Sequence, residues 1–118
     1  MGMRDETTTV AELRLKMREF VDARKWQRFH DPKNLAMSIA IEAAELMEHF
    51  QWLRNEELDP IRTSDATMQE IREELADIMC YVLSFANALE IDVADAVAAK
   101  LVKNERKYPA DQFHGKFR

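Results

Sequence analysis

The sequence predicts an all-α protein, and its composition and apolar spacing are the observations that predict it. Hydrophobic residues make up 47% of the 118 residues, which is enough for a folded chain. Only two residues are glycine and three are proline, so little of the turn chemistry that a multi-stranded sheet needs is present. Apolar residues recur at helical spacing between capping signals. We expect one domain over residues 1–118, a four-helix bundle with its core at about 9–109.

The first helix is expected to begin at Thr9, because Thr9 and Glu12 have the spacing of a capping box. It should end near Phe29, since the Asp-Pro pair at 31–32 supplies an N-cap followed by proline at a first helical position. The second helix then extends through Leu53.

This second helix is apolar on several sides. A helix that is apolar nearly all round is buried on more than one side, and a chain this short needs a second subunit to bury it. We therefore expect a homo-oligomer. The apolar residues are Leu35, Ile39, Ile41, Leu46, Met47 and Phe50.

The one substantial loop is expected over residues 54–65. A second capping-box pattern, at residues 67–70, begins a third helix that reaches about Leu89. Asp92 can cap a fourth helix, which has to stop before Pro109.

The tail over residues 110–118 is expected to be irregular. The charge balance of 17 basic and 22 acidic residues, a net charge of -5, argues against binding to a nucleic-acid polymer, which needs a basic stripe. The single Cys80 cannot form an internal disulfide, which fits a reducing compartment. No apolar run approaches the length of a membrane span. We expect a cytoplasmic protein with no membrane partner.

Two helices each carry a pair of acids three residues apart among apolar neighbours. On the second helix Glu42 falls within the apolar stripe and Glu45 lies one step to the side; on the third, Glu74 and Asp77 border the stripe. If these helices pack antiparallel, the four carboxylates face one another. They would raise each other's pKa unless a cation compensated them. We expect Mg²⁺, with Mn²⁺ as a substitute.

A simpler interpretation is that these acids are solvated, as acid pairs on helices usually are. A structural helical oligomer whose acids form salt bridges between subunits also fits the pattern. It predicts that Mg²⁺ has no effect on thermal stability, whereas a metal site predicts stabilisation by mass action.

Polar residues continue the apolar stripe of the fourth helix at Lys100 and Asn104, with Tyr108 close by. They suit a cavity lined for phosphate oxygens. They equally suit a helix that leaves the core near its end, where lysine favours the helix dipole.

Aromatic side chains gather at the ends of the first two helices. Trp26, His30 and Trp52 lie in turns beside polar residues, where flat rings could stack on a nucleobase. Aromatic residues more often fill cores, and a lone histidine in a turn is a weak signal.

Together these segments resemble the MazG-like superfamily of all-α nucleoside triphosphate pyrophosphohydrolases, and within it the dCTP pyrophosphatase branch. Over about residues 10–110 the resemblance is carried by the acid pattern E-x-x-E followed by E-x-x-D and by three further motifs. These are W-Q-R-F-H-D-P-K-N-L at 26–35, F-Q-W at 50–52, and the stretch from Lys100 through Asn104 to Tyr108 and Pro109.

The resemblance implies hydrolysis between the α- and β-phosphates of dCTP or a modified cytosine nucleotide, which serves nucleotide-pool control or sanitation. It implies an assembly of dimers or tetramers with shared sites. Met17 stands where relatives can carry a pocket histidine, which leaves the base preference open. By position, the metal ligands would be Glu42, Glu45, Glu74 and Asp77, and the substrate-binding residues Trp26, His30, Trp52, Tyr81, Lys100, Asn104 and Tyr108.

We assign activation of the attacking water to Glu45, because it lies at the edge of its stripe rather than at the centre. Two alternatives remain open. One is a non-catalytic regulator that binds nucleotide or metal, and the other is a hydrolase for a different nucleoside triphosphate.

Overall fold

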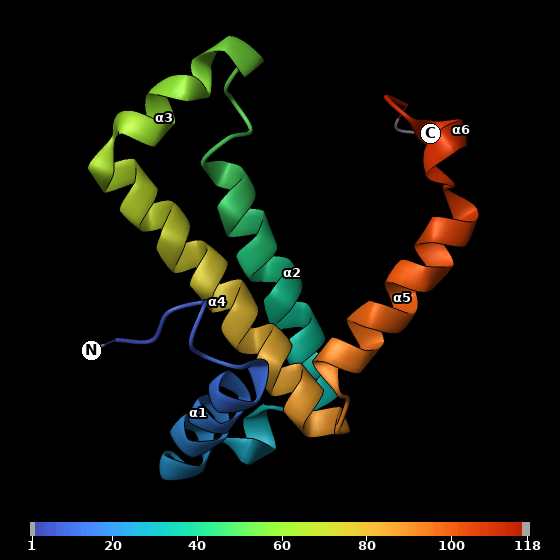
Figure 1. Cartoon of the computed structure of the whole chain (residues 1–118). Helices are drawn as coiled ribbons and strands as arrows, with labels where there is room; N and C mark the ends of the chain where they lie inside the picture. The colour runs from blue at the N-terminus through green and yellow to red at the C-terminus, as the bar shows by residue number, and fades with distance from the viewer. Residues whose placement is uncertain (1, 117–118) are drawn as a thin grey trace.

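The computed structural model describes residues 2–116, which are helical with no strand (Figure 1). The prediction of an all-α fold is confirmed. Six α-helices and two short 3₁₀ turns follow one another in the order α1 (Val10–Ala23), η1 (Gln27–Phe29), α2 (Pro32–Glu48), η2 (Asn55–Glu57), α3 (Asp59–Thr63), α4 (Asp65–Leu89), α5 (Val93–Lys107) and α6 (Ala110–Phe113).

The body of the molecule is the pair α2 and α4, which lie side by side and run in opposite directions (Figure 1). Helix α1 packs on α4, and the short α3 packs against the beginning of α4. Helix α5 leaves this body as a separate arm that carries α6 and the C-terminal end (Figure 1). The antiparallel arrangement of the two acid-bearing helices is therefore the one expected.

Local capping explains where three of the helices begin. The Thr9 hydroxyl accepts a hydrogen bond from the backbone N–H of Glu12 at 3.1 Å. The Asp31 carboxylate caps α2, with proline at the first turn, and the Asp92 carboxylate caps α5 in the same way. Each cap satisfies an N–H that has no partner within its helix. The three predicted starts are confirmed.

The predicted ends of the first two helices are wrong. Helix α1 ends at Ala23 rather than near Phe29, because Lys25 takes the left-handed conformation, with φ 53°, and turns the chain. The backbone N–H of Trp26 then bonds back to the Val21 carbonyl. Helix α2 ends at Glu48, and residues 49–52 form turns.

Helix α4 begins three residues earlier than predicted. Ser64, not Thr67, is its N-cap, and the Ser64 hydroxyl accepts from the backbone N–H of Thr67. The loop expected over residues 54–65 contains η2 and α3. The tail expected to be irregular contains α6, while its residues 117–118 lie outside the described residues.

The buried core of this single chain is small. Its buried hydrophobic residues are Val21, Leu35, Leu83 and Ala86. The solvent-accessible surface is 9879 Å², whereas a compact monomer of 13.8 kDa is expected to expose about 6,600 Å². The radius of gyration is 17.4 Å, against about 13.5 Å for a compact domain of this length. The chain by itself thus exposes roughly 3,300 Å² more than a compact fold would.

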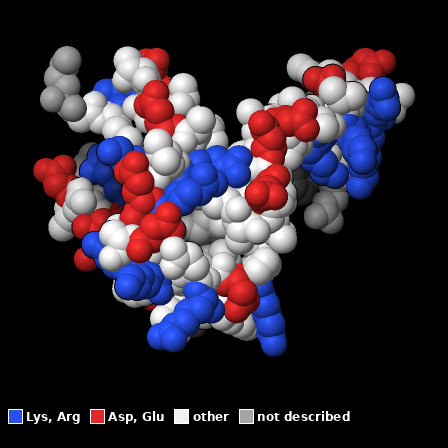
Figure 2. Space-filling view, turned by 90° about the horizontal axis from the view of Figure 1, so that it is seen from below, with Lys and Arg blue, Asp and Glu red and all other residues white. Residues whose placement is uncertain are grey.

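The α5 arm accounts for part of this extra surface. Val97 and Leu101 are each more than half exposed, at 53% and 55%. Figure 2 shows the arm as a lobe set off from the body by a notch, with Lys and Arg side chains along it. Its exposed basic residues include Lys100, Lys103 and Arg106.

Candidate functional site

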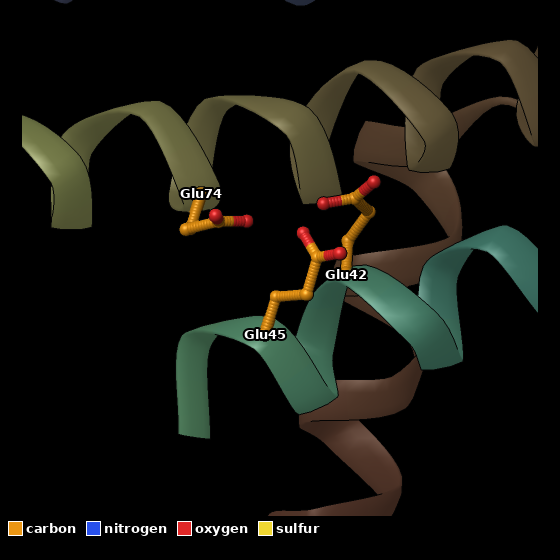
Figure 3. A group of neighbouring side chains, drawn as sticks. All are labelled: Glu42, Glu45 and Glu74. Carbon is orange, nitrogen blue, oxygen red and sulfur yellow. The ribbon is translucent and has the colours of Figure 1, made fainter. Parts of the chain in front are cut away.

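Three carboxylates converge where α2 faces α4. Glu42 and Glu45 lie one turn apart on α2, and Glu74 extends toward them from α4 (Figure 3). One oxygen from each can be chosen so that all three lie within 4.8 Å of one another. The antiparallel packing of the two helices therefore produces the juxtaposition of acids that the sequence predicts, for three of the four.

Two oxygens of this cluster are left without a partner. The Oε2 atoms of Glu42 and Glu74 are both shielded from solvent and accept no hydrogen bond. Burial of the Glu42 carboxylate, reinforced by the neighbouring Glu45 carboxylate, raises the pKa of Glu42 to about 7. Burial likewise raises the pKa of Glu74 above its ordinary value. The cluster thus holds charge that the described protein groups do not compensate.

The cluster has the chemistry and the size for a divalent cation. Hard cations prefer carboxylate oxygens, at about 2.0–2.6 Å. Two ligands on opposite sides of such an ion are therefore about 4–5 Å apart, which matches the 4.8 Å limit among the three oxygens. The two orphaned oxygens supply lone pairs for this role. The residues present fit the group.

Asp77 does not join the three glutamates. It is exposed, and its carboxylate is not among those whose oxygens lie within 4.8 Å of one another. Its negative charge still contributes to the raised pKa of Glu42 and of Glu74. Asp77 therefore lies within electrostatic reach of the cluster without sharing its central position.

An aromatic row extends the site along α4. The Trp26 and His30 rings stack with their centroids 6.3 Å apart, and the His30 ring lies 6.4 Å from that of Tyr81. Burial, followed by the charges of Glu42 and Asp77, raises the pKa of Tyr81. Three of the predicted pocket residues are thus neighbours, and Tyr81 connects them electrostatically to the acids.

Four other predicted pocket residues are not part of this arrangement within one chain. Trp52, in the turns after α2, is 85% exposed. Lys100, Asn104 and Tyr108 lie on the α5 arm, which leaves the body of the molecule (Figure 1). A single copy of the chain leaves these four residues outside the α2–α4 site.

A cavity of about 240 Å³ between α1, η1 and α4 adds residues that the sequence reasoning missed. Ser84 and Asn87 line it from α4, opposite Met17 on α1. Ser84 is only 5% exposed. The one signal in the sequence was a serine in the otherwise apolar stretch 82–86, because a polar group inside a core stripe needs a reason.

Among residues 2–116, no helix combines the length and the apolar character that crossing a bilayer requires.

Known proteins resemble this chain over most of its length. The model of the MazG-like family matches residues 37–116, which include all four predicted acids. The chain is 36% identical over 107 residues to dCTP pyrophosphatase 1 of Bos taurus, covering 91% of this chain and 63% of that protein. The Homo sapiens protein of the same name is 35% identical over 102 residues, covering 86% and 60%. The chain thus spans about three fifths of the length of these relatives.

A solved structure supports the fold assignment over nearly the full length of both chains. It is the crystal structure of a pyrophosphatase from Archaeoglobus fulgidus, with a TM-score of 0.77 and 42% sequence identity. The match covers 92% of this chain and 99% of that one.

Proposed function

Because this chain belongs to the MazG-like family, we propose that it is a divalent-metal-dependent nucleoside triphosphate pyrophosphohydrolase. Its expected substrate is dCTP or a modified cytosine deoxynucleotide, cleaved to the nucleoside monophosphate and pyrophosphate. The observation that carries the proposal is the convergence of Glu42, Glu45 and Glu74, with two orphaned oxygens, on one point between α2 and α4. The names of the relatives, dCTP pyrophosphatase 1 and a pyrophosphatase, support the reaction class.

Glu42, Glu45 and Glu74 would hold the cation, and Asp77 would supply a fourth carboxylate from the adjoining turn of α4. A bound Mg²⁺, or Mn²⁺ in its place, supplies neutralisation of the triphosphate and a lowered pKa for a nearby water. Glu45 is the exposed member of the cluster. It can therefore orient the attacking water and accept its proton at a carboxylate oxygen.

The aromatic row suits the base and sugar. Trp26, His30 and Tyr81 form a contiguous set of rings beside the acids, and a base can stack on such rings at about 1–3 kcal/mol. The expected phosphate- and pocket-binding groups Trp52, Lys100, Asn104 and Tyr108 then have to come from a second copy of the chain.

A homo-oligomer is the second part of the proposal. The surplus is roughly 3,300 Å² per chain, or about 6,600 Å² for two copies, which is at least as large as the total of about 2,000–5,000 Å² that obligate interfaces commonly bury. Burying Val97 and Leu101 of α5 against another copy would also bring that arm's lysines to a neighbouring site. We expect Leu101→Asp to shift the sedimentation coefficient toward that of a monomer, whereas Lys103→Asp, on the same helix but polar in the native chain, leaves association intact.

We place this activity in nucleotide-pool control in the cytoplasm, where the single free Cys80 would stay reduced. The deciding experiment is incubation with a panel of deoxynucleoside triphosphates and Mg²⁺, with pyrophosphate and orthophosphate measured separately. Pyrophosphate released fastest from cytosine nucleotides supports the proposal. A different best substrate would redirect it to another base, and no pyrophosphate from any nucleotide would favour the non-catalytic regulator.

The role of Glu45 has its own test. Glu45→Gln is expected to lower turnover more than a hundredfold, an amount at the low end of what positioned proton transfer contributes. The exposed Glu48, on the same helix outside the cluster, provides the matched control Glu48→Gln. Near-normal turnover of Glu45→Gln would remove it from the water-activating role.

A further inference from the structure

The cavity between α1, η1 and α4 continues the α2–α4 site toward the end of α4. Met17 and Val21 supply apolar wall, and His30 and Ser84 line it together. Its volume of about 240 Å³ is roughly eight times the share of one liquid water, so it has room for a heteroaromatic ring. Ser84 follows Glu74 by ten residues, about 15 Å along the helix axis. That separation leaves space for a sugar and a phosphate chain.

Two polar atoms in this cavity have no partner. Ser84 is 5% exposed, and its hydroxyl makes no hydrogen bond. A serine inside a helix commonly bonds to the carbonyl four residues earlier, but Ser84 does not. The Nδ1 atom of His30 is also shielded from solvent and unpaired. Buried polar groups are almost always paired in native proteins, so two orphans on one cavity indicate a missing partner.

The neighbouring polar side chain shows that polar groups lining this cavity are not generally left unpaired. Asn87, one turn beyond Ser84 on the same cavity, is well bonded. Its amide oxygen accepts from Arg14 at 3.0 Å, and its amide nitrogen donates to the Arg14 carbonyl at 3.0 Å. The polar group on this wall that holds the helices together is therefore paired. The unpaired ones belong to His30, a member of the aromatic row, and to Ser84, three residues after Tyr81 on α4.

We propose that Ser84 is a specificity-determining residue whose hydroxyl, together with Nδ1 of His30, hydrogen-bonds the polar edge of the substrate's nucleobase in this cavity. The inference rests on the proposed function, because it takes the bound molecule to be a nucleotide. A hydroxyl both donates and accepts, and a neutral imidazole nitrogen does one or the other. The pair therefore matches an edge on which a donor and an acceptor adjoin. Met17 and Val21 would contact the apolar faces of the ring.

The test compares Ser84→Ala with Ser38→Ala, a matched control at the half-buried helical serine of α2, which does not line the cavity. Binding of deoxynucleosides, without phosphates or metal, is measured by NMR titration. Ser84→Ala is expected to weaken binding of the preferred nucleoside about 2- to 12-fold, the range of one neutral hydrogen bond. The KM of the corresponding triphosphate should rise by a similar factor, with kcat unchanged, and the ratio between preferred and poor bases should fall.

Thermal unfolding without nucleotide separates recognition from structure. Removing an orphaned hydroxyl should leave the unfolding temperature of Ser84→Ala equal to or above that of the native protein. Ser84→Cys, which keeps a similar shape but only a weak hydrogen-bonding group, should bind as poorly as Ser84→Ala. A lowered unfolding temperature with unchanged nucleoside binding would show that Ser84 holds only an ordered water, and would overturn the inference.

Failure of this inference is distinct from failure of the proposed function. If the native protein releases pyrophosphate but Ser84→Ala keeps its KM and its base preference, only the assignment of Ser84 is wrong. If the native protein releases no pyrophosphate from any nucleotide, the proposed function is wrong, and the inference that depends on it falls with it.

Discussion

Replacing Glu42 by glutamine is expected to stabilise the metal-free protein at pH 8. Glu42, Glu45 and Glu74 hold like charges with oxygens within 4.8 Å of one another, and the Oε2 atoms of Glu42 and Glu74 have no hydrogen-bond donor. A glutamine amide in place of Glu42 removes one charge and offers an N–H to the remaining carboxylates. A side chain that is repelled by its neighbours in the metal-free fold does not stabilise that fold, and it is a candidate for binding a cation.

The magnitude follows from Coulomb's law. At 4.8 Å one pair of charges repels by about 0.9 kcal/mol in water and about 3.5 kcal/mol at an effective dielectric of 20. The cluster is only partly shielded from solvent, so we take about 1–2 kcal/mol for Glu42→Gln after screening. For a chain of this size that amounts to a rise of about 4–8 °C in the unfolding temperature.

The pH dependence of stability independently predicts that the ionised Glu42 destabilises the metal-free fold. The pKa of Glu42 is raised to about 7 in the folded protein, against 4.5 when unperturbed, so the folded state holds the proton more tightly. Between these two values the folded state binds more protons than the unfolded one, and stability falls as pH rises. The native metal-free protein should therefore lose stability from about pH 4.5 to pH 7, and the advantage of Glu42→Gln should vanish below pH 4.5.

Differential scanning calorimetry at pH 8 and pH 4, with EDTA or with Mg²⁺, measures both effects. Mg²⁺ at a hundred times its dissociation constant should stabilise the native protein by about 2.7 kcal/mol and Glu42→Gln by much less. Glu48→Gln, on the exposed face of α2, should behave as the native protein does in every condition. A lowered unfolding temperature of Glu42→Gln in EDTA at pH 8, or equal stabilisation of both proteins by Mg²⁺, would refute the argument.

Three further substitutions test how the helices are held. Arg14→Ala removes three hydrogen bonds, two to the end of α4 and one to Ile91 in the connection that follows, and should cost about 2–3 kcal/mol in urea unfolding. Arg18→Ala, which loses one long contact to Asn87, should cost less than about 1 kcal/mol. Ser64→Ala removes the N-cap of α4 and should cost about 1 kcal/mol in the same assay, and no loss would mean that the cap is immaterial. Lys25→Gly, at a φ of 53°, should raise the unfolding temperature by relieving about 1 kcal/mol of backbone strain, while Lys16→Gly inside α1 should lower it by a similar free energy.

Helix starts were predictable because they depend on residues close in sequence. The caps at Thr9, Asp31 and Asp92 each bond an N–H three residues later, so the spacing alone identifies them. Ser64 was missed because Thr67 offered the same chemistry with a glutamate three residues on. The structure uses the earlier hydroxyl, and the later one becomes part of the first turn.

Helix ends were less predictable because they depend on contacts distant in sequence. The pattern of α1 continues in an apolar register past Ala23, but the chain turns at Lys25. After the turn, Trp26 stacks on His30, and His30 lies beside Tyr81 of α4. No residue between 23 and 29 is glycine or proline. The packing of these rings in the folded chain offsets the strain of a left-handed lysine, and that packing cannot be seen in the sequence.

The acid site was visible in the sequence for a physical reason that the Ser84 cavity lacks. Carboxylates at helical spacing within an apolar stripe conflict with burial, and such a conflict can be seen from periodicity alone. A serine is small and weakly polar, so its position in a stripe raises no comparable conflict until its partners can be counted in three dimensions. Asp77 shows the converse limit, since periodicity placed it beside Glu74 but could not give the position of its carboxylate in three dimensions.

Helix α2 carries exposed apolar side chains as well as two of the three clustered acids, and this connects the proposed assembly with the proposed metal site. Ile41, which precedes Glu42 in the sequence, is 59% exposed, and Met47, two residues after Glu45, is 62% exposed. A second copy that covered them would remove water from around the acids, which strengthens both their mutual repulsion and their attraction for a cation. Because the repulsion acts among single charges and the attraction acts on a double one, the balance moves toward the metal-bound state. In the proposed oligomer, covering this surface would therefore favour occupation of the proposed cation site.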